Sequence, residues 1–230
     1  MTVVVGTGTP VGTYPIIVTA DGGGIQQTAT VTLIVSNTVQ DLQITTDTDD
    51  VYYDPGNLAG GGTWNISGSP GYNHTSFVGS WGGIVNAFST GVRYPSVGLP
   101  QGAQISSATL SIYGGTMPPI NGPSLIRVYG EGVDNAPVWA DVTGSRPDSI
   151  PYTTVHVDYT GSDPNWAGAW HQIDVTAIVQ EIVNRGGWVP GNAIAFALIG
   201  VDNRNYYLPL ADSSQWPGFG PTLNIVRTQQ

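Results

Sequence analysis

Two runs in which apolar and polar residues alternate stand near the start of the chain. They cover Tyr14–Ala20 and Gln26–Val35, and three consecutive glycines follow Asp21 between them. Alternation with a period of two indicates strands, and a short Gly-rich connection indicates a hairpin turn. The pattern predicts a β-hairpin within residues 1–37. Because an isolated hairpin is marginal in water, we expect it to need a partner.

From about Val39 onward, short apolar runs alternate with loops that are rich in Gly and Pro. Strands at this spacing are typical of a β-sandwich, so the pattern predicts an all-β domain over residues 38–230. The clearest strands are Leu42–Thr46, Ile84–Tyr94, Gln104–Tyr113, Leu125–Tyr129, His171–Val175, Ala193–Val201 and Thr222–Arg227.

One segment has the period of a helix instead. Five apolar residues recur at helical spacing and therefore share one face: Val175, Ile178, Val179, Ile182 and Val183. This stripe predicts one short amphipathic helix that closes an edge or end of the sandwich. We expect Asp174 to cap its start and Gly186 or Gly187 to cap its end.

Several segments carry a family resemblance. The run Arg93–Leu110 resembles part of jelly-roll domains of the carbohydrate-binding, DNRLRE-like kind, as found in phage and bacterial surface proteins. Tyr129–Ala136, Asp174–Trp188 and Pro221–Ile225 resemble relatives of these domains, and the hairpin resembles the last two strands of an immunoglobulin-like domain. The resemblance implies a jelly-roll β-sandwich with the hairpin as an N-terminal arm. It leaves function open, because this architecture hosts sugar binders, adhesins and virion parts alike.

The charge balance narrows the classes of partner. The chain has 16 acidic and 6 basic residues, a formal net charge of −10, and no lysine. Nucleic acids and anionic membranes both attract basic surfaces, so we expect no nucleic-acid partner and no membrane insertion. Cysteine is absent, which excludes disulfides and thiolate chemistry.

Candidate catalytic groups are sparse. The three histidines, His74, His156 and His171, do not have a metal-ligand spacing, and no G-x-S-x-G motif occurs. Glycosidases need two carboxyl groups beside the scissile bond, and the only glutamates are Glu131 and Glu181, although aspartates could substitute. We therefore expect that the protein is not an enzyme.

A cluster of aspartates offers a candidate metal site. Asp47, Asp49, Asp50 and Asp54 lie close together in the sequence, and calcium prefers such closely spaced oxygen ligands on a loop. The EF-hand pattern is missing. Two interpretations remain open: a structural calcium ion held by Asp47, Asp49 and Asp50, or a solvated turn.

Aromatic residues offer a candidate sugar site. All seven tryptophans lie beyond residue 60, several of them in loops rich in Gly, Ser or Pro. Exposed aromatic rings can stack on the apolar faces of sugars while neighbouring amides bind the hydroxyls. The carbohydrate-binding candidates are Trp64, Tyr72, Asn73 and Trp81, and the competing interpretation is that each aromatic ring packs against the sandwich.

These observations favour a non-catalytic structural or adhesive surface protein. The leading hypothesis is a virion component, such as a capsid decoration or fibre protein, at the virion surface or outside the cell. Its hairpin would be an attachment arm in a homo-oligomer, a dimer or trimer, that also contacts other virion or surface proteins. The alternative is a carbohydrate-binding module of a secreted enzyme or adhesin, with glycans as its ligands.

Overall fold

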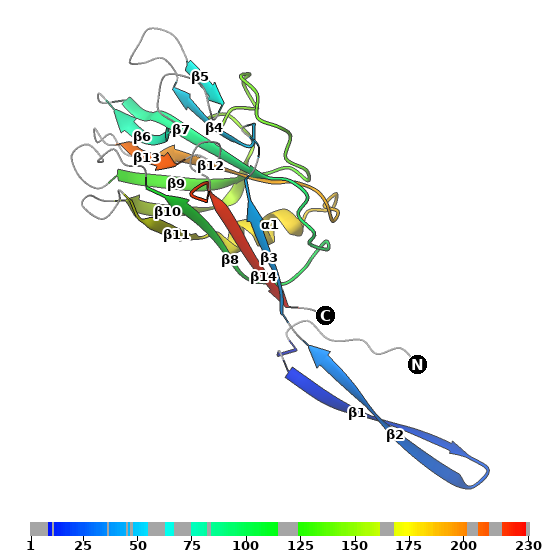
Figure 1. The fold of residues 1–230 in the computed structure, drawn as a ribbon. Coiled ribbons are helices and arrows are strands. Elements are labelled where there is room, and N and C mark those ends of the chain that lie inside the picture. The colour runs from blue at the N-terminus through cyan, green and yellow to red at the C-terminus, as the bar shows by residue number, and fades with distance from the viewer. Residues whose placement is uncertain are drawn as a thin grey trace.

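Two packed antiparallel sheets, one helix and a projecting two-stranded arm make up the structure (Figure 1). The predicted all-β sandwich with a single short helix is confirmed. The structure is a computed structural model, and it describes residues 9–10, 12–35, 37–44, 46, 48–54, 63–66, 75–81, 84–114, 124–161, 168–201, 207–211 and 218–228.

The smaller sheet of the sandwich has the strand order β11-β8-β14-β3. Every second side chain of its central strands points inward, and Leu110, Ile112, Leu223 and Ile225 are fully buried. The residues between them are serines, threonines and asparagine, which point outward. The strands are β3 (Asn37–Gln43), β8 (Ile105–Tyr113), β11 (Trp170–Asp174) and β14 (Thr222–Thr228).

The larger sheet has the order β10-β9-β12-β7-β4-β5, with β6 and β13 joined to it through β7. Its central strand β12 is buried on both faces: Phe196 and Leu198 face the main core, and Ala195 and Ala197 face a second cluster. The strands are β4 (Asp50–Asp54), β5 (Thr63–Ile66), β6 (Thr75–Trp81), β7 (Ile84–Tyr94), β9 (Ser124–Glu131), β10 (Tyr152–Gly161), β12 (Ile194–Gly200) and β13 (Tyr207–Ala211).

The path of the chain between these sheets is that of a jelly roll. β3 and β14, the first and last strands of the sandwich, are neighbours in the smaller sheet, and β8 and β11 complete it. β7, β12, β9 and β10 lie side by side in the facing sheet, so the chain crosses from sheet to sheet as it proceeds. Seven of the eleven described strand pairings therefore join strands that are not consecutive in the sequence.

Helix α1 (Thr176–Val183) closes one end of the sandwich. The predicted apolar stripe is confirmed, because Val175, Ile178, Val179, Ile182 and Val183 are all buried. The helix packs against β8 of one sheet and against β9 and β10 of the other.

The predicted caps of α1 are not observed at either end. The N-cap position is Val175, which makes no side-chain capping hydrogen bond, and Asp174 lies one residue earlier, where it accepts a 2.9 Å hydrogen bond from the amide of Thr176. The prediction for the C-terminal end is wrong, because the helix is capped by Asn184 in a right-handed conformation rather than by a glycine. Gly187 has a different role: a Cβ there would collide with the carboxylate of Asp134.

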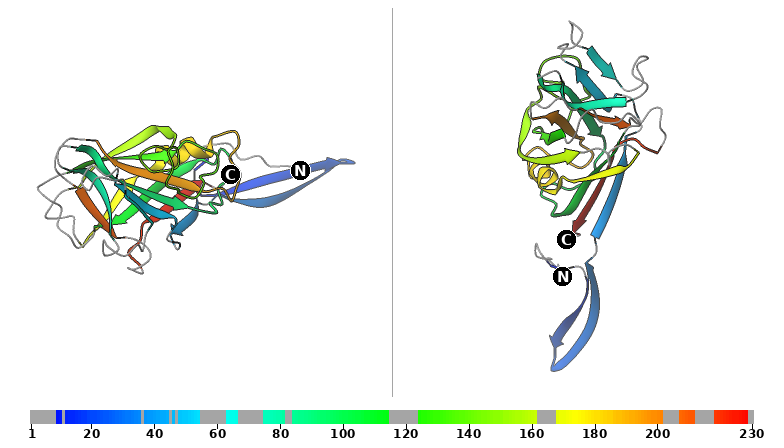
Figure 2. Two further views of the ribbon diagram at one scale, coloured as in Figure 1. Left: turned by 90° about the horizontal axis from the view of Figure 1, so that it is seen from above. Right: turned by 90° about the vertical axis from the view of Figure 1, so that its left-hand side faces the viewer.

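The predicted hairpin is confirmed as β1 (Gly12–Gly22) and β2 (Ile25–Val35). The two residues of its turn, Gly23 and Gly24, have φ angles of 59° and 77°, which suit a type I′ turn and favour glycine. Among the described residues, β1 and β2 pair only with each other, and the hairpin projects from the end of the sandwich as an arm (Figures 1 and 2).

The strand prediction at Leu42–Thr46 is displaced. The observed strand β3 runs from Asn37 to Gln43, and Ile44 is buried beyond its end. β3 is an edge strand whose outward side chains are Val39, which is 53% exposed, Asp41 and Gln43, and its register is set by pairing with β14. β10 was not among the predicted strands, although Val155, Val157 and Tyr159 alternate with polar residues along it.

Candidate functional site

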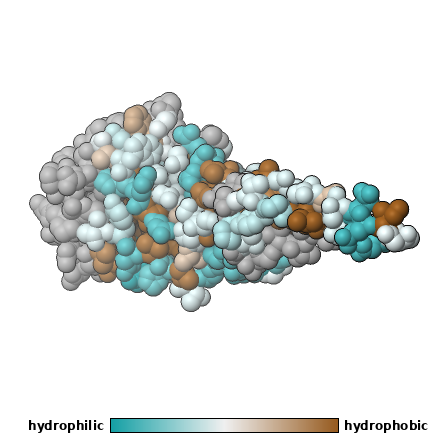
Figure 3. Space-filling view, turned by 90° about the horizontal axis from the view of Figure 1, so that it is seen from below, coloured by the Kyte–Doolittle hydropathy of each residue, from teal (hydrophilic) through white to brown (hydrophobic). Residues whose placement is uncertain are grey.

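The arm carries apolar side chains on both of its faces. Register places Ile16 beside Val31 and Tyr14 beside Leu33 on one face of the hairpin. The opposite face carries threonines and also Ile17 and Ile34, which are 70% and 68% exposed. The space-filling view shows hydrophobic residues at several places along the arm, up to its tip (Figure 3).

Within the described part of the chain, the arm has two open strand edges. Each of its strands is 11 residues long and pairs with a described strand on one side only. Asp21, beside the turn, is the only charged residue between Gly12 and Val35. Soluble proteins usually protect an exposed edge with charges, bulges or a covering element, so an edge of this length and low charge favours pairing with another chain.

The aspartates of the predicted cluster have different environments in the structure. Asp49 forms a 2.6 Å ion pair with Arg93, and the two side chains are only 8% and 14% exposed. The Arg93 Nε group also donates to the carbonyl oxygen of Ala136. Asp50 begins β4 and is 1% exposed, so the solvated-turn interpretation is wrong for these two residues.

The calcium hypothesis stays a prediction. Asp47 lies outside the described residues. Within the described residues, no group of three or more His, Asp or Glu side chains is close enough to hold a metal ion. The carboxylate of Asp49 would have to serve Arg93 and a calcium ion at the same time.

The predicted carbohydrate-binding residues lie largely outside the described part of the chain. Tyr72 and Asn73 are not described, and only the backbone of Trp64 in β5 and of Trp81 in β6 is placed. The sugar site predicted at these four residues therefore remains a prediction. Other tryptophans divide between the two interpretations: Trp139 and Trp188 are buried, whereas Trp170 is 43% exposed.

The two glutamates have separate environments. Glu181, on α1, accepts 2.8 Å hydrogen bonds from the backbone amides of Thr154 and Val155, where β10 leaves its regular register. Glu131 is buried at the end of β9, and burial raises its pKa to about 7 although Arg93 acts in the opposite direction. Glu181 therefore has a structural role, and burial of Glu131 favours the protonated form of its carboxyl group.

A long loop between β9 and β10 covers the outer face of the larger sheet. Trp139 and Pro147 lie against Gly91, where an added Cβ would come within 2.7 Å of the indole. Trp139 belongs to a second apolar cluster that includes Val51, Ile150 and the alanines of β12. Small residues on β7 and β12 thus make room for the loop.

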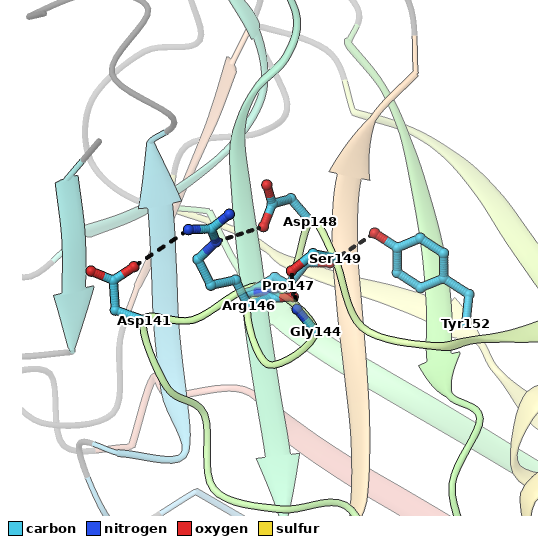
Figure 4. A network of polar contacts seen from close by, with 7 residues as sticks. All are labelled: Asp141, Gly144, Arg146, Pro147, Asp148, Ser149 and Tyr152. Atoms are coloured by element: carbon cyan, nitrogen blue, oxygen red, sulfur yellow. Dashed lines mark hydrogen bonds and ion pairs between the residues drawn. The ribbon is translucent and has the colours of Figure 1, made fainter. Parts of the chain in front are cut away.

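Polar contacts hold this loop in shape (Figure 4). Arg146 lies between Asp148, at 3.3 Å, and Asp141, at 3.7 Å, and its guanidinium stacks 4.2 Å above the ring of Tyr53. Tyr152 donates a 2.9 Å hydrogen bond to the carbonyl oxygen of Pro147. Arg146 therefore links the loop, through Asp141 and Asp148, to the sheet beneath it, through Tyr53.

Comparison with known proteins gives no family. No protein-family model matches the chain, and no curated protein matches its sequence. The resemblance to DNRLRE-like domains therefore remains a prediction. In the part of the chain that is described, no helix has the length and apolar character required to cross a membrane.

Proposed function

We propose that this protein is a non-catalytic structural or adhesive surface protein, and specifically a virion component such as a capsid decoration or fibre protein. In this proposal the arm, residues 12–35, attaches the sandwich to another copy of the chain or to another virion protein. The single observation that carries it is the uncovered apolar surface of the arm, with Ile17 and Ile34 about two-thirds exposed.

The shape of the molecule supports this proposal. The sandwich has its own core, made by residues of β7, β8, β9, β12, β14 and α1, and no residue of the arm belongs to that core. The arm projects from one end of the sandwich (Figure 2). An exposed strand edge can add a strand from a partner, and closed symmetry of a dimer or trimer would cover such edges.

The experiment is a comparison of oligomeric state by light scattering. We expect the whole chain to be a dimer or trimer and the Ile17→Lys variant to be a monomer, because a charge on this face opposes burial. Val142→Lys is a matched control, since Val142 is 58% exposed in the loop that covers the larger sheet. A monomeric whole chain that also fails to bind any purified virion protein would overturn the proposal.

Deletion of residues 1–37 gives a second measurement. If the arm only attaches the sandwich, the remaining chain should stay soluble and rich in β structure while assembly is lost. Circular dichroism and size-exclusion chromatography measure both properties. An insoluble or molten product would show that the arm is needed for folding and would contradict its role as an attachment element.

A further inference from the structure

Part of the outer face of the smaller sheet carries polar side chains. Strand register places eight residues in two adjacent rows, and each of them is half-buried or exposed. One row is Gln172, Ser111, Thr222 and Gln43, and the next is Asp174, Thr109, Asn224 and Asp41. Neighbouring strands lie about 4.8 Å apart, so the eight side chains form one continuous surface, here called the polar face.

An exposed aromatic cluster borders the polar face at one end. Trp170 lies opposite Tyr113 in the strand register, immediately beyond the first row, with ring centroids 5.3 Å apart. Phe219, just before β14, is 4.5 Å from the ring of Tyr113. Trp170 is 43% exposed and Phe219 is 36% exposed.

The geometry of these rings suits stacking. The planes of Trp170 and Phe219 are inclined by only 19°, with centroids 6.3 Å apart, so their faces point in nearly the same direction. Tyr113 contacts both rings at steeper angles and is half-buried. The two partly exposed and nearly parallel rings offer aromatic surface on which flat apolar groups can stack.

The polar face provides the complementary hydrogen-bonding groups. Gln172, Gln43 and Asn224 carry amides, and Ser111, Thr109 and Thr222 carry hydroxyls, so donors and acceptors alternate across the surface. Asn224 also donates to Asp41, which orients the amide. A shallow depression of about 240 Å³ lies among Asp41, Gln43, Thr222 and Asn224.

The charge of the face restricts the ligand. Asp41 and Asp174 are its only charged residues, and neither row contains a basic residue. The hydrogen bonds from Thr176 hold the pKa of Asp174 below its usual value, so this carboxylate stays ionised at neutral pH. A ligand that carries carboxylates or sulfates would be repelled.

We infer that the polar face and the aromatic cluster together form a binding site for neutral polysaccharides. Sugar rings would stack on Trp170 and Phe219, and their hydroxyls would exchange hydrogen bonds with the amides and hydroxyls of the two rows. A protein partner fits this surface less well, because the centre of a protein interface is depleted of charge and enriched in apolar and aromatic groups. Here the aromatic rings lie at one end, and the centre is polar.

The site goes beyond the proposed attachment function and does not depend on it. The arm and the polar face share no residues, and the face is formed entirely by strands of the sandwich. Loss of assembly and loss of sugar binding can therefore be measured independently on the same preparation.

The test is affinity electrophoresis of the whole chain in gels that contain a neutral polysaccharide, using a β-glucan, a mannan and a galactan in turn. We expect retardation by at least one of them and none by pectate or heparin. Isothermal titration with oligosaccharides of the retarding polymer then gives Kd. Retardation only by the anionic polymers, or by no polymer, would overturn the inference.

Variants locate the site. Trp170→Ala and Phe219→Ala should each raise Kd at least tenfold, and Trp170→Phe should recover part of the loss because it restores a ring. Val189→Ala, a change at a valine that is 55% exposed elsewhere, is the control and should leave Kd unchanged. If an alanine variant fails to fold, Gln172→Ala, an exposed change on the polar face, should still weaken binding several-fold.

Two results distinguish this inference from the proposed function. The Ile17→Lys variant should bind the polysaccharide as tightly per site as the unmodified chain, even if it no longer assembles. Binding that is unchanged in both Trp170→Ala and Phe219→Ala would place the sugar site elsewhere and would overturn the inference while leaving the arm proposal intact.

Discussion

The Glu181 carboxylate on α1 lies against the backbone of β10 and accepts a 2.8 Å hydrogen bond from the amide of Val155. Its second oxygen accepts from Thr154, so one side chain satisfies two amides that the irregular register of β10 removes from the sheet ladder. Thr153 completes the arrangement by accepting from the amide of Gly130.

Replacement of Glu181 should therefore destabilise the fold. We expect Glu181→Ala to lower the free energy of unfolding by about 1–3 kcal/mol, because two amides lose their acceptor. Glu181→Gln should cost less, since the amide oxygen can still accept one of the bonds. Urea denaturation followed by circular dichroism measures the difference, and an alanine variant as stable as the unmodified chain would contradict this role.

The contact between Gly91 and Trp139 gives a second prediction. A Cβ at position 91 would lie 2.7 Å from the indole and 2.8 Å from Pro147, so the covering loop would have to move. We expect Gly91→Ala to destabilise the protein by roughly 1–3 kcal/mol through overpacking. Gly186→Ala is the matched control, because nothing lies within 4 Å of a Cβ there. Equal unfolding midpoints for the two variants would rule out the tight contact.

The raised pKa of Glu131 predicts a dependence of stability on pH. Burial raises this pKa from 4.5 to about 7, so between these values the folded chain holds a proton that the unfolded chain has released. The contribution of Glu131 to the free energy of unfolding should then be greatest below about pH 4.5. It should fall by roughly 1–3 kcal/mol as pH rises through 7.

The control for this effect is Glu131→Gln, which should remove the slope between pH 5 and 8. Asp158 and Asp174 act in the opposite direction, because their pKa values are lowered and their contribution is lost only in more acidic solution. Unfolding by urea at several pH values separates the two ranges. A slope that persists in Glu131→Gln would assign the effect to another group.

The calcium hypothesis predicts an effect of chelation. If an ion binds Asp47, Asp49 and Asp50, it stabilises the native state by mass action, so EDTA should lower the Tm and added calcium should restore it. Asp49→Asn should then reduce the shift. A Tm that stays constant across a calcium titration would remove the hypothesis and leave Asp49 as the partner of Arg93 alone.

Local patterns allowed several elements to be predicted closely. The stripe from Val175 to Val183 predicted the buried face of α1, and the strand predicted at Ile84–Tyr94 has the same bounds as β7. The three glycines after Asp21 predicted the turn of the arm. Each of these signals arises within a few residues, because it reflects backbone geometry and the spacing of one apolar face.

The aromatic cluster could be recognised only from the tertiary structure. Tyr113 and Phe219 are more than 100 residues apart in the sequence, and Trp170 lies between them. Nothing in the local sequence around these three residues marks them as neighbours. The pairing of β8 with β11 and β14 brings them together. Trp64 and Trp81 were distinguished by their Gly- and Ser-rich surroundings, a compositional signal that carries no information on which rings meet.

The sequence by itself determined that this protein is an all-β sandwich with one amphipathic helix and a two-stranded arm. Only the tertiary structure decided that Asp49 and Asp50 are buried, that Glu181 supports β10, and that an aromatic cluster borders a polar face. The physical reason is the range of the interactions. Periodicity acts within one strand or helix, whereas burial, ion pairing and surface composition depend on strand partners that a jelly roll draws from distant parts of the chain.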